Sequence, residues 1–434
     1  MLNLRRELVT KLVCFLGTSK YYETVYTFQD RECTTCYFPV AAAEFFQPDC
    51  ILLFVTKAAE DKHLERLRAE LGGRFELRPV NIPEGKREEE LWELFSKLTS
   101  RLGDGDDVIF DITFGFRSIP VLATIAASYL RVARNVRLQK IVYGAYEAKD
   151  QQGKAPVFDL TPFLALLDWT TATYLFLQTG IAAPLVERLR QANWSSGLRA
   201  EALEEVTAAM RLTRPDEARS LAYQFSQALS TLHLASPAAK PFELLLDQVR
   251  DEFARIAPRS PQPDDLEQEL REEYALIQWN FNRGQFLSAI TVTREWLVSL
   301  LCWHANWTTH VTDKNSGQAV PAWRSEEVRK KGEKALNHLK ELATLDEAER
   351  AKQIGSKTPI AQELWKRNAA YAEQLGSAWG LASSLRNDLN HAGKVHSTTP
   401  RSLRDILHEI ECTRRTLTDL FTASGLESHP TPTL

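Results

Sequence analysis

The stretch DVIFDITFGFRSIPVLATIAASYLRVAR, residues 107–134, contains the structural unit on which the fold prediction rests. Residues 107–114 form a short apolar run with β-branched and aromatic side chains, which is typical of a buried strand. Residues 119–134 carry apolar side chains at helical spacing. Gly115 lies between the two segments, where the backbone has to turn. The stretch therefore predicts a strand, a turn and a helix in succession.

The same alternation of apolar runs and helical patterns extends over residues 10–160. Strands are predicted at 11–17, 50–56, 75–82, 107–114, 138–146 and 156–160, and helices at 57–71, 87–102 and 119–134. The runs at 25–28 and 36–40 predict a β-hairpin. Strands that alternate with helices of this length indicate βαβ units. We therefore expect an N-terminal Rossmann-like α/β domain with a doubly wound, mostly parallel sheet.

Helical patterns replace the strand patterns after Pro162. The stretch ARIAPRSPQPDD, residues 254–265, is rich in proline and polar residues and is the clearest linker in the chain. Three parts follow from these changes: an α/β domain, a helical connecting region and a C-terminal all-α domain. Their expected bounds are 1–165, 166–262 and 263–434. Within the last part, the polar residues 308–357 predict an irregular segment.

The composition limits the class of protein. The 434 residues are 44% hydrophobic and 25% charged, which is typical of a globular chain with more than one domain. The net charge of -4 provides no overall basic surface, so any contact with nucleic acid must be local. The N-terminus lacks a signal-peptide pattern, and the apolar stretch at 169–186 contains polar residues, glycine and proline, which favours a buried helix pair over a membrane span. We expect a cytoplasmic protein without membrane contact.

Two of the six cysteines, Cys33 and Cys36, form a CxxC pair. A structural zinc ion needs four ligands, and no second pair of cysteines or histidines follows at a suitable spacing. We therefore expect reduced thiols that pack in the fold and no bound metal. A metal-binding pair is the alternative interpretation.

Two strand exits supply candidate binding residues, because ligands of open α/β sheets bind at the carboxyl ends of the strands. Gly17, Thr18 and Ser19 follow the first strand. After residues 107–114, Arg117 offers a planar set of donors and Ser118 can cap the next helix, whose free N–H groups favour an anion. Each motif alone is also a common turn or cap. Together, and without a GxGxxG or GxxxxGK[ST] motif, they predict a nucleotide or phosphodiester ligand.

The polar stretch SLRNDLNHAG, residues 384–393, contains Arg386 and His391. On a helix the two residues lie ~140° apart, so they converge only where the helix ends, and Gly393 is a plausible end. The pair suits metal-free RNA cleavage, in which a 2'-hydroxyl attacks phosphorus, His391 transfers protons and Arg386 neutralises the phosphate. Such cleavage leaves a 2',3'-cyclic phosphate and a 5'-hydroxyl. The same spacing also occurs by chance in many helices.

These residues resemble the motifs of known families. RNDLNH at 386–391 resembles the R-x4-6-H motif of HEPN ribonucleases. FLGTSKYYETVY at 15–26 and DITFGFRSIP at 111–120 resemble the signature segments of the CARF domain, a Rossmann-like sensor of cyclic oligoadenylates. A CARF domain first and a HEPN domain last is the layout of the ancillary CRISPR-associated ribonucleases of type III systems. The resemblance covers essentially the whole chain.

The resemblance implies a homodimer or higher homo-oligomer in which cyclic tetra- or hexa-adenylate activates an endoribonuclease that cleaves single-stranded RNA in antiviral defence. Arg386 and His391 would be catalytic, with Asn387 as a helper and no metal cofactor. The residues that match the ligand-facing segments are Gly17, Thr18, Ser19, Thr113, Phe114, Gly115, Arg117 and Ser118. Phe114 departs from many family members, which carry a polar residue there, often histidine. Its ring either stacks on an adenine or weakens degradation of the activator.

Three further features have two interpretations each. Glu295 either orients Arg386 or His391 or is a surface carboxylate. The basic cluster at 324–340 lines an RNA groove or forms a solvated helix face. The tryptophan-rich stretch at 296–307 belongs to a core or dimer interface rather than to a base-stacking surface. If the Arg386–His391 pair is only structural, the alternative function is a ligand-sensing regulator that binds nucleic acid or protein without cleaving it.

Overall fold

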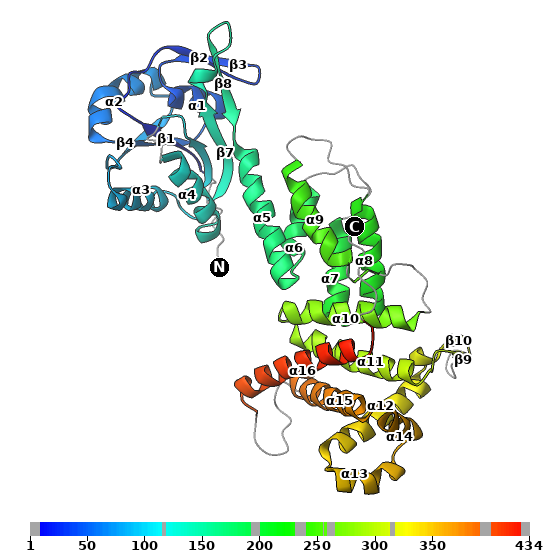
Figure 1. Cartoon of the computed structure of the whole chain (residues 1–434). Coiled ribbons are helices and arrows are strands. Elements are labelled where there is room, and N and C mark those ends of the chain that lie inside the picture. The colour runs from blue at the N-terminus through cyan, green and yellow to red at the C-terminus, as the bar shows by residue number, and fades with distance from the viewer. Residues whose placement is uncertain are drawn as a thin grey trace, which may run out of the picture. The chain divides into compact units, whose positions relative to one another are not determined.

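The computed structural model describes residues 9–114, 119–191, 200–230, 240–254, 256–257, 265–312, 317–390 and 401–426. The chain divides into two compact units, Met1–Leu167 and Asp168–Leu434. The first unit contains an α/β sheet, and the second consists mainly of helices (Figure 1). The predicted fold class, an α/β sheet followed by a helical region, is therefore confirmed. The division of the helical part at residue 262 stays a prediction.

The described residues of the first unit form an eight-stranded, mostly parallel sheet with the order β3-β2-β8-β7-β6-β1-β4-β5. The strands are β1 (Thr10–Leu16), β2 (Thr24–Phe28), β3 (Arg31–Thr35), β4 (Cys50–Val55), β5 (Glu76–Asn81), β6 (Asp107–Asp111), β7 (Arg137–Gly144) and β8 (Lys154–Asp159). β1 pairs in parallel with both β4 and β6. β7 with β8 and β2 with β3 are antiparallel pairs. The chain thus moves outward from β1 in one direction through β4 and β5, and in the other through β6 and β7.

Helices cover both faces of this sheet (Figure 1). They are α1 (Phe38–Phe46), α2 (Lys57–Leu71), α3 (Glu88–Ser100) and α4 (Ile119–Ala133), with a 3-10 turn at Tyr146–Ala148. Alternate residues of β1 point to opposite faces: Leu12 and Cys14 pack with α1 and α2, whereas Val13 and Phe15 pack with α3 and α4. This alternation explains why β1 is apolar from Leu12 to Leu16, because the part of a strand that is covered on both sides buries every side chain.

One predicted element of the first unit was wrong. The hairpin exists, but its second strand is β3 rather than residues 36–40. Gln29 has a positive φ of 54°, and the two-residue turn at Gln29 and Asp30 pairs Phe28 directly with Arg31. The return strand therefore begins at once. Residues from Phe38 start α1 instead, with a proline in its first turn, where the missing N–H is not needed.

The helices that follow the sheet, the first of which crosses the boundary between the two units, pack around an aromatic cluster. These are α5 (Thr161–Thr179), α6 (Ala183–Gln191), α7 (Ala200–Arg211), α8 (Pro215–Ser230) and α9 (Lys240–Ala254). The ring of Phe253 lies 5.6 Å from that of Phe176 and 5.3 Å from that of Phe225, and all three side chains are buried. The chain between α5 and α6 turns within the apolar stretch at 169–186, so the helix pair is confirmed, but it is only partly buried, with Tyr174 65% exposed.

The remaining elements are packed largely around one hydrophobic core, whose buried side chains come mainly from the longer helices. They are α10 (Leu266–Asn282), α11 (Phe286–His304), β9 (His310–Thr312), β10 (Ala319–Pro321), α12 (Glu326–Thr344), α13 (Glu347–Gln353), α14 (Pro359–Arg367), α15 (Ala369–Asn390) and α16 (Leu403–Ala423), with 3-10 turns at Ala322–Arg324 and Ile354–Ser356. Gly376 lets α15 approach α12 closely, since a Cβ there would lie 2.5 Å from the carbonyl oxygen of Leu339.

The expectation of an irregular segment at 308–357 was wrong. Its middle is the long helix α12, 19 residues in length, whose Ala335, Leu336 and Leu339 side chains are buried against α15 while most of its charged residues face outward. Many charged residues lower the mean hydropathy of this segment, so the helical spacing of its apolar residues is hard to recognise in the sequence. The stretch at 296–307 lies mostly in α11, where Trp296, Leu300 and Leu301 are buried, so the core interpretation is confirmed. By length and composition α11 could cross a membrane, but 67% of its apolar window is buried in the core.

Candidate functional site

A pocket of about 340 Å³ opens at the carboxyl ends of β1, β6 and β7. β1 and β6 are neighbours from which the chain proceeds in opposite directions, and such a reversal leaves a crevice where ligands of open α/β sheets bind. The pocket is lined by Gly17, Thr18, Ser19, Lys20, Tyr21, Tyr22, Tyr26, Cys36, Thr113, Phe114, Tyr143, Gly144, Tyr146 and Glu147. All of these residues belong to the first unit.

The structure brings the two predicted strand exits together. Gly17, Thr18 and Ser19 follow β1, and Thr113 and Phe114 follow β6, and all five line the same pocket. The other three predicted binding residues, Gly115, Arg117 and Ser118, lie outside the described residues.

The backbone of the loop after β1 is held by three side chains. The Tyr21 hydroxyl accepts a hydrogen bond from the Gly17 N–H at 3.0 Å and donates to the Gly17 carbonyl at 3.1 Å. Lys62 Nζ donates to the Thr18 carbonyl at 2.6 Å. His63 Nε2 lies 2.9 Å from the Ser19 carbonyl, and burial lowers the pKa of this histidine. These contacts fix the loop while the Thr18 and Ser19 side chains remain exposed to a ligand.

Aromatic rings form much of the pocket wall. The rings of Tyr21 and Phe114 lie 4.3 Å apart, which joins the two strand exits by direct contact. Tyr22 and Tyr146 are exposed, at 54% and 38% of their surface. Sequence reasoning missed these tyrosines, although they lie in the quoted segment 15–26 and at the end of the predicted strand 138–146. Exposed aromatic faces in a polar pocket suit the stacking of nucleobases.

A buried carboxylate lies beneath the pocket. Asp111, the last residue of β6, is fully buried, and its Oδ1 accepts a hydrogen bond from the Thr113 N–H at 2.8 Å. Its Oδ2 has no hydrogen-bond partner among the described residues. Burial raises the pKa of Asp111 to about 7, and burial together with the charge of Asp111 raises the pKa of the Cys14 thiol. The Asp111 carboxyl group is therefore partly protonated near pH 7.

The end of β7 is fixed against β6. The Gly144 N–H donates to the Thr113 hydroxyl at 2.8 Å. A Cβ at Gly144 would lie only 2.4 Å from the Phe38 ring, so this position has room only for glycine. Tyr143 donates to Glu147 at 3.1 Å, and both residues line the pocket. The pocket thus combines hydroxyls, aromatic faces, a carboxylate and Lys20, which are the groups that contact the base, sugar and phosphate of a nucleotide.

The predicted catalytic residues fall at the end of α15. Arg386 is half-buried and Asn387 is exposed, both within four residues of the last residue of α15, Asn390. His391 lies outside the described residues, so its geometry with Arg386 is a prediction only. Arg401 donates to the Ser384 hydroxyl and pairs with Glu409 of α16 at 2.9 Å. Arg401, just before α16, therefore contacts α15 at Ser384, two residues before Arg386.

Glu295 has a different partner from the one expected, whereas Cys33 and Cys36 are free thiols, as expected. Glu295 pairs with Arg329 at 2.8 Å and lies 3.6 Å from Arg294, so its described ion pairs do not include Arg386. The proposal that it orients Arg386 is therefore not supported by its contacts. Cys36 accepts a hydrogen bond from Arg66 at 2.9 Å and Cys33 lies in β3, and both thiols are free.

Comparisons with known proteins relate the middle of the chain to CRISPR-associated proteins. Residues 165–261 match the family described as CRISPR-associated protein MJ1674, second domain. CRISPR-associated protein MJ1674 of Methanocaldococcus jannaschii is 32% identical over 123 residues, which cover 28% of this chain. The matched stretch spans only about a fifth of that protein, at 19% of its length.

A solved structure shows a more distant likeness. Enterococcus italicus Csm6 bound to cyclic hexa-2'-fluoro-hexa-dAMP gives a TM-score of 0.42 at 11% identity, with 95% of each chain covered. A likeness this weak carries no argument about the binding site. The similarity to a CRISPR-associated protein therefore rests on residues 165–261.

Proposed function

We propose that the pocket in the first unit binds a cyclic oligoadenylate, with cyclic tetra- and hexa-adenylate as the candidates. The observation that carries the proposal is the meeting of Gly17–Ser19 and Thr113–Phe114 in one pocket at the reversal of the strand order. The exposed tyrosines suit adenine rings, and the hydroxyls with Lys20 suit the phosphodiester backbone. The similarity of residues 165–261 to a CRISPR-associated protein supports a role in type III antiviral defence.

The output is a metal-independent cleavage of single-stranded RNA at Arg386 and His391. His391 removes the proton from the 2'-hydroxyl and supplies one to the leaving 5'-oxygen, and Arg386 stabilises the charge that grows on the phosphate. Asn387, which is next to Arg386 in the sequence and exposed, assists by hydrogen-bonding to the same phosphate group. Arg386 lies within four residues of Asn390, the last described residue of α15, which directly precedes His391 in the sequence.

The protein acts in the cytoplasm as a homodimer or a higher homo-oligomer. Helices α3 and α4 carry apolar side chains that are unusually exposed: Trp92 at 65%, Val121 at 60%, Ile125 at 53%, Tyr129 at 53% and Val132 at 87%. The four residues on α4 recur every three or four positions and so share one helix face. A contiguous apolar face of this kind favours contact with a second copy.

Cleavage of labelled RNA in EDTA, with and without cyclic tetra- or hexa-adenylate, tests this function. We expect activator-dependent cleavage that ends in a 2',3'-cyclic phosphate. His391→Ala should abolish it, whereas the control His408→Ala, at an exposed position of α16, should retain it. Absence of activator-dependent cleavage, or cleavage undiminished in His391→Ala, would exclude the nuclease.

A ligand-sensing regulator without catalysis is the second candidate. It predicts tight activator binding with no cleavage of any RNA. Arg117→Ala separates the sensor from the output, because it should remove activation while RNA binding persists. Binding of cyclic oligoadenylate that is unchanged in Arg117→Ala and in Tyr21→Ala would place the ligand elsewhere.

A further inference from the structure

Four carboxylates gather where α8 meets α10 in the second unit. Glu269, Glu272 and Glu273 lie on one face of α10, at positions three and four residues apart, and Asp216 lies in the first turn of α8. The three glutamates are each only 6% exposed. Burial of several carboxylates in one place is costly unless each is neutralised.

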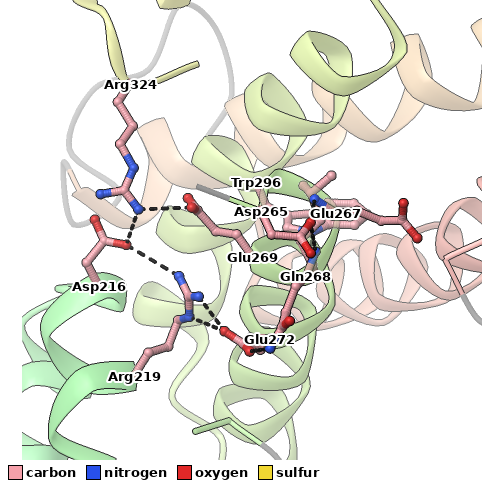
Figure 2. A network of polar contacts seen from close by, with 10 residues as sticks. Asp216, Arg219, Asp265, Glu267, Gln268, Glu269, Glu272, Trp296 and Arg324 are labelled. Atoms are coloured by element: carbon pink, nitrogen blue, oxygen red, sulfur yellow. Dashed lines mark hydrogen bonds and ion pairs between the residues drawn. The ribbon is translucent and has the colours of Figure 1, made fainter. Parts of the chain in front are cut away.

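Two arginines neutralise part of this cluster. Figure 2 shows the Asp216 carboxylate between the guanidinium groups of Arg219 and Arg324, at 3.5 and 3.3 Å. Arg324 also pairs with Glu269 at 2.9 Å, and Arg219 Nε donates to Glu272 at 2.8 Å. Four carboxylates thus face two guanidinium groups. A third guanidinium group, that of Arg329, also acts to lower the pKa of Glu273, but the four carboxylates still outnumber the cations that act on them.

Glu272 is fully engaged, but Glu273 is not. Gln268 donates to the second oxygen of Glu272 at 2.7 Å, so both oxygens of that carboxylate have partners. Glu273 Oε2 is buried and has no hydrogen-bond partner among the described residues. Burial first, and then the charge of Glu269, raise the pKa of Glu273 to about 8. An unpartnered buried oxygen beside other carboxylates is the mark of a site that takes a positively charged ligand.

The spacing of the oxygens fits a metal ion. One carboxylate oxygen from each of Asp216, Glu269 and Glu273 lies within 4.8 Å of the others. Calcium binds oxygen ligands at about 2.4 Å and magnesium at about 2.1 Å, so ligands on opposite sides of such an ion are about 4 to 5 Å apart. A donor set of oxygens alone favours these hard cations over zinc or copper.

We propose that Asp216, Glu269 and Glu273 bind a divalent cation that prefers oxygen ligands, of the class of Mg²⁺, Mn²⁺ and Ca²⁺, and that the ion fastens α8 to α10. The ion has a structural role, because its ligands come from neither the pocket of the first unit nor the helix that carries Arg386. The ion joins α8, which precedes the proline-rich linker, to α10, which follows it. Ser230 at the end of α8 and Leu266 at the start of α10 are 36 residues apart in the sequence.

Cation binding to the full-length chain, stripped with a chelator and dialysed, tests this proposal. Mg²⁺, Mn²⁺ and Ca²⁺ are titrated by calorimetry and by thermal unfolding, against NaCl of matched ionic strength. We expect saturable binding of one ion per chain and a rise in Tm. Glu273→Gln and Asp216→Asn should each weaken binding at least about tenfold. Glu267→Gln, which changes a half-buried glutamate of the same helix that pairs with Arg271, should bind as the wild type does.

The cation-free stabilities provide a second readout. Glu273→Gln keeps the shape of the side chain and carries no charge at any pH, so without cation it should unfold at a Tm no lower than that of the wild type. If Glu273 instead supports the fold without binding a cation, Glu273→Gln should unfold at a lower Tm than the wild type. No saturable binding of any of the three ions up to about 10 mM, or binding that neither Glu273→Gln nor Asp216→Asn weakens, would overturn the proposal. The test uses neither RNA nor activator, so its failure leaves the proposed function untouched.

Discussion

Replacement of Asp111 by asparagine should remove the pH dependence that this residue gives to the first unit. Burial raises the pKa of Asp111 from 3.8 to about 7. At about 1.4 kcal/mol for each tenfold change in an ionisation constant, this difference corresponds to an upper limit of about 4 kcal/mol. The introduced amide keeps an acceptor for the Thr113 N–H, which is 2.8 Å from Asp111 Oδ1, and carries no charge at any pH.

The sign follows from the raised pKa in the folded state. The stabilising contribution of neutral Asp111 is fully present below about pH 4, decreases as the pH rises, and is lost above about pH 7. Asp111→Asn should therefore be more stable than the wild type at pH 8, and the difference should shrink toward pH 4. Hydrogen exchange of the β1 and β6 amides in the full chain, compared between variant and wild type at each pH, measures this difference.

Asp107, at the other end of β6, is the matched control with the opposite sign. Burial raises the pKa of Asp107, but hydrogen bonds from Arg137 and Gln139 outweigh it, so the net pKa is lowered. Its contribution is present above about pH 4 and is lost as the pH falls, so Asp107→Asn should destabilise the sheet at neutral pH. An Asp111→Asn variant that is less stable than wild type at pH 8, or a difference independent of pH, would refute the reasoning.

Two further substitutions test the pocket wall. Tyr21→Phe keeps the ring but removes both hydrogen bonds to Gly17, so cyclic oligoadenylate should bind about five- to tenfold more weakly by calorimetry. The control Tyr22→Phe should change the affinity little. Equal affinity of the two variants would contradict the role of the Tyr21 hydroxyl. Gly144→Ala places a Cβ against the buried Phe38 ring and should lower the free energy of unfolding, measured in urea, by about 1 to 3 kcal/mol. The control Gly355→Ala, with no atom within 4 Å of its Cβ, should leave the free energy of unfolding unchanged. An unchanged urea midpoint for Gly144→Ala would show that the site relaxes freely.

Much of the fold follows from local patterns. The apolar runs of β1, β4 and β6 and the helical spacing of α4 are properties of neighbouring residues, so the strand and helix assignments there could be predicted. The errors occurred where local patterns are weak. The return strand β3 has the sequence RECTT, and its mostly polar, exposed residues do not form the apolar pattern of a buried strand. Helix α12 is rich in charged residues, and only a narrow face of it is apolar and buried.

The binding site was predicted in part for the same reason. Residues that follow β1 and β6 could be named, because each lies next to its own strand. The tyrosines could not, since Tyr143 and Tyr146 reach the pocket only because β7 pairs with β6. Partner choice is equally non-local: Glu295 pairs with Arg329 because α11 packs on α12, which no spacing in the sequence reveals.

The sequence by itself determined the alternation of strands and helices, the two strand exits, and the polar end of the helix that carries Arg386. These depend on periodicity and turn chemistry, which act over a few residues. Only the tertiary structure decided that the exits after β1 and β6 meet in one pocket, that Asp111 is buried beneath it, and that Asp216 joins the glutamates of α10. Those outcomes depend on which distant segments pack together, and packing sets the burial and the neighbouring charges that give each group its chemistry.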